Sequence, residues 1–341
     1  MYYPLLKYAN NEMKALKELK SSSKSKLIPI IESKRVKPEN QNKWESTFNT
    51  LGSYLKDRVD SIKFIYDFNC AIEELSSKDE LLSKEGENLV VHCLNKMKDQ
   101  QLSIIPCFHH DSPEWLIESV LNSEAEEIAI RIRCHDFQEP FDKFVYSKLK
   151  EDLSSLSDST KVTIILDFFN SNTTTLRVKK AITIFNDLNP SNIVFLSTAC
   201  PENASDADVH DLTLVSARDE LNNYLELKKE FPMLNFGDYT TRLKGEVLKG
   251  FNHNLSYLKI FYTTDTDYYI AKSKLIKDGA EDSFFEICQQ IVDCDFYPGE
   301  SFSFGDEEIK KCADKKITIS NHQAPIAISV NHHIETTINQ L

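Results

Sequence analysis

The sequence predicts an α/β protein built as a (β/α)8, TIM-barrel-like fold with a C-terminal extension. Short runs rich in β-branched and aromatic residues recur along the first 275 residues. Each run is nearly continuous in apolar character, which is typical of parallel strands covered on both faces. Amphipathic helical stretches separate most of the runs, and eight such units in about 250 residues match the usual size of this barrel.

Eight runs are expected to form the strands. In chain order they are residues 26–32, 62–68, 102–108, 127–133, 162–169, 192–198, 234–240 and 256–262. The last two runs are weaker. A second extended run follows the eighth, so we expect a hairpin that returns after Thr266.

The clearest helix start is Ser112-Pro113-Glu114, where a hydroxyl able to cap the helix precedes proline and an acidic first turn. The other expected helices are residues 11–20, 43–55, 84–98, 141–153, 174–188 and 217–231. A doubly wound open sheet is the alternative fold. It is weakened because no G-x-G-x-x-G turn follows any strand.

The alternation of strands and helices breaks down after about residue 276. We therefore expect residues 1–275 to form the barrel and residues 276–341 to form an α+β extension packed on it.

Composition excludes several classes of protein. The 341 residues carry 40 Lys and Arg against 53 Asp and Glu, a net charge of −13, which argues against broad nucleic-acid binding. There is no apolar run of about 18 residues and no signal-peptide pattern, so no membrane association is expected. The eight cysteines are scattered without a C-x-x-C pair, which predicts reduced core thiols and a cytoplasmic location.

Polar residues end most of the predicted strands, at the edge where such barrels carry their sites. Four carboxylates there could bind Mg²⁺ or Mn²⁺ or divide into an acid and a base: Glu32, Asp67, Asp167 and Asp238. Arg131 is a candidate for holding a phosphate or carboxylate. His109 is a candidate base or ligand, and only one of the neighbours His109 and His110 is expected to face the site.

Further candidates come from the last two predicted strands and from the C-terminal double histidine. Tyr239 and Tyr262 end the strands, while His332 and His333 pose the same orientation problem as His109 and His110. His109, His333 and Asp167 are the catalytic candidates. The alternative is that the polar ring consists of ion pairs lining the barrel mouth.

Nearly the whole chain resembles the Beta protein family. The most specific matches are Phe236-Gly237-Asp238-Tyr239-Thr240 and Asn331-His332-His333-Ile334, whose order and distance from the chain end both fit. Weaker matches are Tyr3-Pro4, Leu6-Lys7, Glu12, Pro29–Glu32, Asp67, Arg131, Asp167, Arg218 ahead of a helix, Tyr262-Thr263 and Phe302–Asp306.

The sequence also departs from the family pattern. Asn11 replaces a glycine, and Gln323–Ile328 replaces a Thr-Thr-Trp-Arg stretch. The resemblance implies a barrel-like α/β fold, ligand-binding roles for matching residues such as Arg218, and a setting among mobile elements and antiphage defence genes. It implies no reaction.

Three functions follow as hypotheses. The favoured one is a component of a bacterial antiphage defence system that recognises a phage component or an operon-encoded partner protein. The second is a metal-dependent phosphodiesterase or related hydrolase, in which Arg131 holds the phosphate and His109 or His333 serves as acid or base. The third is a structural or oligomerisation subunit. The sequence does not set the oligomeric state.

Overall fold

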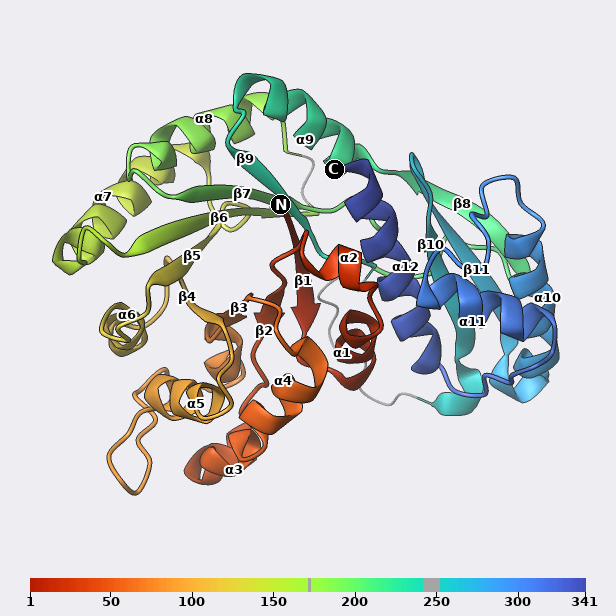
Figure 1. Cartoon of the computed structure of the whole chain (residues 1–341), viewed down its shortest axis with the longest axis horizontal. Helices are drawn as coiled ribbons and strands as arrows, with labels where there is room; N and C mark the ends of the chain where they lie inside the picture. The colour runs from red at the N-terminus through yellow and green to blue at the C-terminus, as the bar shows by residue number, and fades with distance from the viewer. Residues whose placement is uncertain (171–172, 242–251) are drawn as a thin grey trace. The chain divides into compact units, whose positions relative to one another are not determined.

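The computed structural model describes residues 1–170, 173–241 and 252–341 (Figure 1). Its contacts divide the chain into two compact units. The barrel unit comprises Met1–Tyr8, Ile28–Ser197 and Leu221–Asp238. The second unit comprises Ala9–Leu27, Thr198–Glu220 and Tyr239–Leu341. Among the residues described, no helix has the length and apolar character needed to cross a membrane.

A closed barrel of eight parallel strands forms the first unit, which confirms the predicted fold class. The strands follow one another around the barrel in chain order: β1 (Tyr2–Lys7), β2 (Ile30–Glu32), β3 (Phe64–Asp67), β4 (Ile104–His109), β5 (Glu127–Arg133), β6 (Lys161–Phe169), β7 (Asn192–Ser197) and β9 (Leu234–Asp238). Most of their residues are buried, as continuous apolar runs predict for a doubly covered sheet.

Helices cover the outside of these strands (Figure 1). They are α3 (Glu45–Phe48), α4 (Leu51–Val59), α5 (Leu89–Lys98), α6 (Glu114–Leu121), α7 (Asp142–Asp152), α8 (Thr175–Asn186) and α9 (Asp219–Glu230), with short 3-10 turns η1 (Pro38–Lys43), η2 (Asn69–Ile72), η3 (Glu139–Phe141) and η4 (Leu153–Ser155). Side chains of Asn88 and Thr174 cap α5 and α8 by accepting backbone N–H groups. The expected cap at Ser112 is wrong, because its hydroxyl accepts the His109 N–H instead.

Two strand predictions need correction. Tyr2–Lys7 is the first barrel strand, whereas residues 256–262 form no part of the barrel. The latter run is β10 (Tyr257–Thr263), which pairs antiparallel with β11 (Asp267–Leu275), as the predicted hairpin requires. Buried and half-exposed residues alternate along most of β10, which is typical of an antiparallel sheet rather than a barrel strand.

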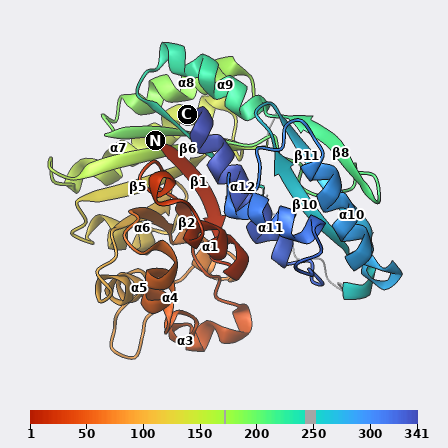
Figure 2. The ribbon, with the colours of Figure 1, turned by 45° about the vertical axis from the view of Figure 1, so that its right-hand side comes forward.

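The second unit is built on the three-stranded sheet β10–β11–β8, where β8 spans Asp211–Ala217. Leu258, Ile260 and Tyr262 share a core with residues of α10 (Ala280–Val292), α11 (Phe304–Ala313) and α12 (Ala324–Gln340). Figure 2 shows these helices beside β10 and β11. The unit also contains α1 (Asn10–Lys17), α2 (Ser21–Lys24), η5 (His253–Leu255) and η6 (Ile276–Asp278).

The chain is therefore not divided at residue 275 as expected. Residues 9–27 and 198–220, which follow barrel strands β1 and β7, join the C-terminal part of the chain. Specific bonds fix the first of these segments: Asn331 donates to the carbonyl of Ala15 at 3.0 Å, and Glu335 accepts from the Ser23 hydroxyl at 2.6 Å. Such long-range hydrogen bonds cannot be predicted from the periodicity of the sequence.

Candidate functional site

Five polar side chains meet at the C-terminal end of the barrel. Each lies at or near the end of its strand, and the parallel register places Glu32 beside Asp67 and His109 beside Arg131. Asp167 lies two residues before the end of β6 and pairs in register with Arg133. All five are buried: Glu32, Asp67, His109, Arg131 and Asp167. The prediction that strand ends would gather these side chains holds for this set.

Arg131 forms the centre of this barrel-end cluster. Its Nε donates to Asp167 Oδ2 at 2.8 Å, and its Nη1 donates to Glu32 Oε1 at 3.1 Å and to Asp67 Oδ2 at 2.9 Å. Nη2 lies 2.8 Å from the same Asp167 oxygen. The guanidinium is thus bound by the protein's own carboxylates, so it is not available to hold a phosphate as predicted.

The same arrangement does not fit the predicted Mg²⁺ or Mn²⁺ site at Glu32, Asp67, Asp167 and Asp238. Three of these carboxylates direct oxygens at Arg131, which takes the position that a cation would occupy. No group of three or more His, Cys, Asp or Glu residues in the described part of the chain is arranged to hold a metal ion. Asp238, also buried, accepts a hydrogen bond from the Tyr2 hydroxyl at 2.6 Å.

Asp67 and His109 form a close pair within the cluster. His109 Nε2 lies 2.7 Å from Asp67 Oδ2, and Asp67 Oδ1 accepts the backbone N–H of Asn69 at 3.1 Å. Burial alone would raise the pKa of Asp67, but His109 and Arg131 outweigh it and hold that pKa below its usual range. Asp67 is therefore the hydrogen-bond acceptor of this pair, and His109 Nε2 is the donor.

The other ring nitrogen of His109 takes no part in the hydrogen bonds of the cluster. His109 Nδ1 is buried and has no hydrogen-bond partner within the described residues. An imidazole that carries its proton on Nε2 has a lone pair on Nδ1, which is the property required of a proton acceptor. Its neighbour His110 turns away and packs its ring against the Phe137 ring at 5.2 Å.

An outer layer surrounds the pair. Ser112 accepts the His109 N–H and donates to Asn69 Oδ1 at 3.0 Å, while His135 Nδ1 donates to the Asp167 carbonyl at 3.0 Å. Sequence reasoning missed Asn69, Ser112 and His135 as site residues. Asn69 could have been predicted, because a polar residue two positions after an aspartate at a strand end often forms a local hydrogen bond.

The remaining predicted site residues belong to the second unit and not to the barrel end. Tyr239 is buried there. Arg218 donates to the Thr337 hydroxyl at 2.9 Å and to the Thr264 carbonyl at 3.3 Å. His333 Nδ1 lies 2.9 Å from the Thr263 hydroxyl. His333 Nε2 lies 3.5 Å from the Thr337 hydroxyl, so both ring nitrogens lie beside hydroxyl groups of the second unit, and the catalytic role of His333 stays a prediction.

His332 and Tyr262 converge on Asp306 of α11. His332 Nδ1 lies 2.8 Å from Asp306 Oδ2, and its Nε2 lies 2.7 Å from the Thr263 carbonyl, so both ring nitrogens lie beside oxygen atoms of the same unit. The Tyr262 hydroxyl donates to Asp306 Oδ1 at 2.9 Å, and its ring stacks on His332. Burial and Asp306 raise the pKa of Tyr262 above its usual range. These partners are internal, which indicates a structural network.

The two adjacent histidines are both buried because they lie on a helix. Neighbouring residues on α12 point about 100° apart, not to opposite sides as on an extended chain. His332 and His333 can therefore both face the interior of the second unit, contrary to the expectation drawn from an extended chain.

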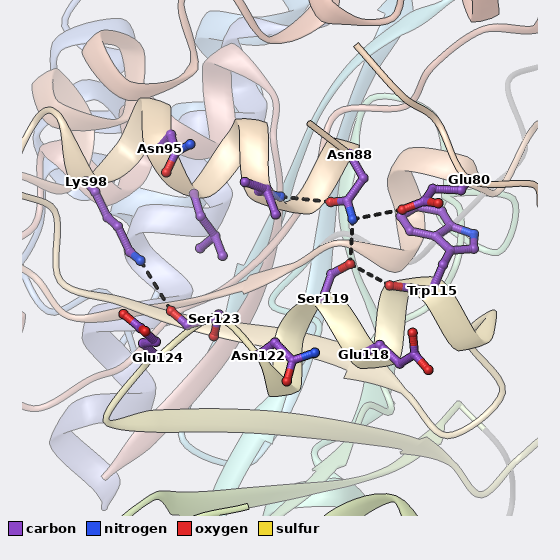
Figure 3. Close-up of a pocket in the computed structure, with 12 residues that line it drawn as sticks. Glu80, Asn88, Asn95, Lys98, Trp115, Glu118, Ser119, Asn122, Ser123 and Glu124 are labelled. Atoms are coloured by element: carbon purple, nitrogen blue, oxygen red, sulfur yellow. Dashed lines mark hydrogen bonds between the residues drawn. The ribbon is translucent and has the colours of Figure 1, made fainter. Parts of the chain in front are cut away.

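Two grooves lie on the outside of the barrel unit. The first, about 470 Å³, runs between α5 and α6 and is rich in amides and carboxylates (Figure 3). Its polar groups largely bind one another: Asn88 donates to Ser119 Oγ at 2.7 Å and to Glu80 at 3.0 Å, and Lys98 donates to the Ser123 carbonyl at 3.3 Å. The Ser123 hydroxyl, by contrast, is buried and has no hydrogen-bond partner among the described residues.

The second groove, about 600 Å³, lies along α7, α8 and η3. It is lined by Glu139, Pro140, Lys143, Leu176, Lys179, Lys180, Thr183, Ile184 and Glu230. Two large aromatic residues, Phe141 and Phe144, directly follow the lining residues Pro140 and Lys143 in the chain; they are 59% and 68% exposed, and their ring centroids lie 6.5 Å apart. Leu176, which is 61% exposed, adds to this apolar surface.

Comparison with models of protein families gives a match over nearly the whole chain. The model of a family described as Beta protein matches residues 2–339, essentially the whole chain. No curated protein matches the sequence.

Proposed function

The chain belongs to the Beta protein family, and on that premise we propose that it is a recognition component of a bacterial antiphage defence system. In this proposal it binds an operon-encoded partner protein or a phage component through the α7–α8 face, defined as Phe141, Phe144 and Leu176. The family resemblance supports the defence setting. The exposed residues of α7 and α8 support the mode of binding.

The exposed α7–α8 face is the observation that carries the proposal. Soluble proteins leave single apolar side chains exposed, but adjoining large ones beside a groove are typical of a binding surface. Phe141 and Phe144 stand three residues apart, so their side chains point to the same side of the chain. Aromatic residues are enriched among those that dominate binding energy.

The barrel-end cluster supports recognition over metal-dependent hydrolysis. Its arginine and carboxylates bind one another, and they fit neither the predicted phosphate nor the predicted metal. Seven of the eight cysteines are buried and all eight are free, which supports a cytoplasmic location for the protein.

Defence assays with surface variants test the proposal. Phe144→Ser and Leu176→Ser should each abolish protection against phage infection and co-purification with the operon-encoded partner, while circular dichroism and thermal stability stay unchanged. Leu225→Ser on α9 is the matched control, because Leu225 is an exposed leucine, at 42%, that does not belong to the α7–α8 face. Full protection by both α7–α8 variants would refute this use of the face.

A second candidate function is acid–base catalysis at the barrel end without a metal, and His109 favours it. Asp67 fixes the proton on Nε2 and leaves Nδ1 able to accept a proton from a bound hydroxyl or water. In this reading His109 is the base and Asp67 is a positioning residue.

Turnover assays with ester and phosphodiester substrates, without added metal, test this candidate. His109→Gln should lower any turnover by about 10²–10⁴-fold, the usual contribution of a general base. His92→Gln, on the outer helix α5, is the control. Turnover that persists unchanged in His109→Gln would exclude this role.

A further inference from the structure

We propose that the α7–α8 groove accepts a partner segment in which aromatic or aliphatic side chains are flanked by Asp or Glu. This inference rests on the recognition function proposed above, and it specifies the chemistry of the partner. It is argued from the apolar side chains of the groove and from the charges at its edges.

The apolar part of the groove lies on the outward side of α8. Leu176, Thr183 and Ile184 are spaced by seven and eight residues, so they share one side of the helix. The opposite side, represented by Val178 and Phe185, is buried against the barrel. Pro140 lines the groove from η3. Large apolar side chains of a partner therefore find apolar surface there that no part of the described chain covers.

The charges at the groove favour an acidic segment. Three lysines line it, Lys143, Lys179 and Lys180, against two glutamates, Glu139 and Glu230. Lys180 pairs with Glu139 at 2.8 Å, and Lys179 pairs with Glu230. Lys143 makes no ion pair with any described residue. One positive charge is thus in excess within a chain whose total is −13.

The existing pairs do not prevent exchange of partners. Both pairs are solvent-exposed, and ion pairs of this kind are worth about 0–1 kcal/mol, so an incoming carboxylate can replace a glutamate. Salt at physiological concentration screens charges that lie more than about 8 Å apart. An incoming segment is therefore attracted by the lysines of the groove more than it is repelled by acidic residues elsewhere on the chain. A nucleic-acid backbone fits less well, because its phosphates would meet Glu139 and Glu230 along with the excess lysine.

Selection from a random peptide library displayed on phage, with the full chain as bait, tests the inference. Enriched peptides should combine Trp, Phe or Leu with neighbouring Asp or Glu. Their affinity, measured by fluorescence anisotropy, should fall at least tenfold in the double variant Lys143→Glu, Lys180→Glu and should weaken as salt is raised. Lys150→Glu, also exposed on α7 but outside the groove, should bind as the wild type does.

Several results would overturn the inference. These are enrichment of basic peptides, absence of any enriched peptide, binding that ignores the lysine variant, tighter binding of an oligonucleotide, or a dimer of this chain that Phe144→Ser dissociates. If Phe144→Ser abolishes binding of the natural partner while the lysine variant retains it, the recognition function stands and only the acidic chemistry fails. If both variants retain the natural partner, the recognition function itself fails.

Discussion

Removal of the Arg131 side-chain charge is the sharpest perturbation of the barrel end. In Arg131→Met, three carboxylates lose their common cation: Glu32, Asp67 and Asp167. Each lies within 3.1 Å of a guanidinium nitrogen and is nearly inaccessible to water, so solvent cannot take over the role of the lost donors. Methionine retains most of the apolar stem and therefore isolates the effect of charge.

The expected cost is about 3–5 kcal/mol in the free energy of unfolding at pH 7, the usual result of leaving a buried charge without its partner. For a unit of this size that corresponds to a fall of roughly 6–20 °C in Tm. Chemical denaturation followed by circular dichroism measures the free energy, and calorimetry measures Tm. Arg133→Met is the matched control on the same strand, since its pair with Asp111 is partly exposed and should contribute about 0–1 kcal/mol.

The cost of Arg131→Met should also depend on pH. In the wild type, the lowered pKa of Asp67 gives a stability contribution that is complete above the unfolded pKa near 4 and is lost as pH falls toward the native pKa. In the variant only His109 still opposes the effect of burial on Asp67. The pKa of Asp67 therefore rises, and the folded variant takes up protons as pH falls. The stability difference between wild type and variant should therefore narrow from pH 7 to pH 4.

Either of two results would refute this reasoning. One is an equal loss in Arg131→Met and Arg133→Met, which would mean that burial of the pair adds nothing. The other is a stability difference that stays constant between pH 7 and pH 4, which would mean that the buried carboxylates do not change protonation. The double variant Arg131→Met, Asp67→Asn should recover part of the loss, because the unpaired charge is removed with its partner.

Three further predictions concern the rest of the chain. Gly237→Ala should cost about 1–3 kcal/mol in denaturation experiments, because the new Cβ would lie 2.7 Å from the Tyr3 carbonyl oxygen. Gly86→Asn should cost less, because it meets no neighbouring atom and only the backbone strain of φ +83°, which asparagine tolerates better than most residues. Ser303→Ala should destabilise α11 by about 0.5–2 kcal/mol and raise hydrogen exchange in that helix, because the hydroxyl caps the Asp306 N–H; unchanged exchange would contradict this. A maleimide should label Cys294 before the seven buried cysteines, and faster at higher pH since burial raises the pKa of that thiol; earlier labelling of any other cysteine by mass spectrometry would be inconsistent with the fold.

The barrel was predictable because its strands are buried on both faces and so read as apolar runs. The first strand was not predicted, since Tyr2–Lys7 contains Pro4, which is unusual within a sheet, and lies at the very start of the chain. The run at 256–262 was predicted as the eighth and weaker barrel strand. The structure buries alternate residues along it, and in the sequence only Lys259 between Leu258 and Ile260 indicates this antiparallel pattern.

The strand ends showed which polar residues would meet but not how they would pair. Glu32, Asp67, Arg131 and Asp167 do gather, yet the sequence could not show that the arginine would bind the carboxylates in place of a metal or phosphate. Pairing depends on side-chain reach across several strands, which residue type and spacing do not encode. The exposure of the α7–α8 face could not be predicted either. Sequence periodicity places Phe141 and Phe144 in a helical region, but it does not show whether another segment covers them.

The residues most specific to the family match have internal structural roles. Asn331 binds the Gly305 N–H and the Ala15 carbonyl, and His332 joins Asp306 to the Thr263 carbonyl. Gly305 has no room for a side chain, because a Cβ there would lie 2.4 Å from the Ile328 carbonyl oxygen. These bonds join separate segments of the second unit, so they stabilise its fold. Function is therefore better sought where the described structure leaves capacity unused, at His109 Nδ1 and on the α7–α8 face.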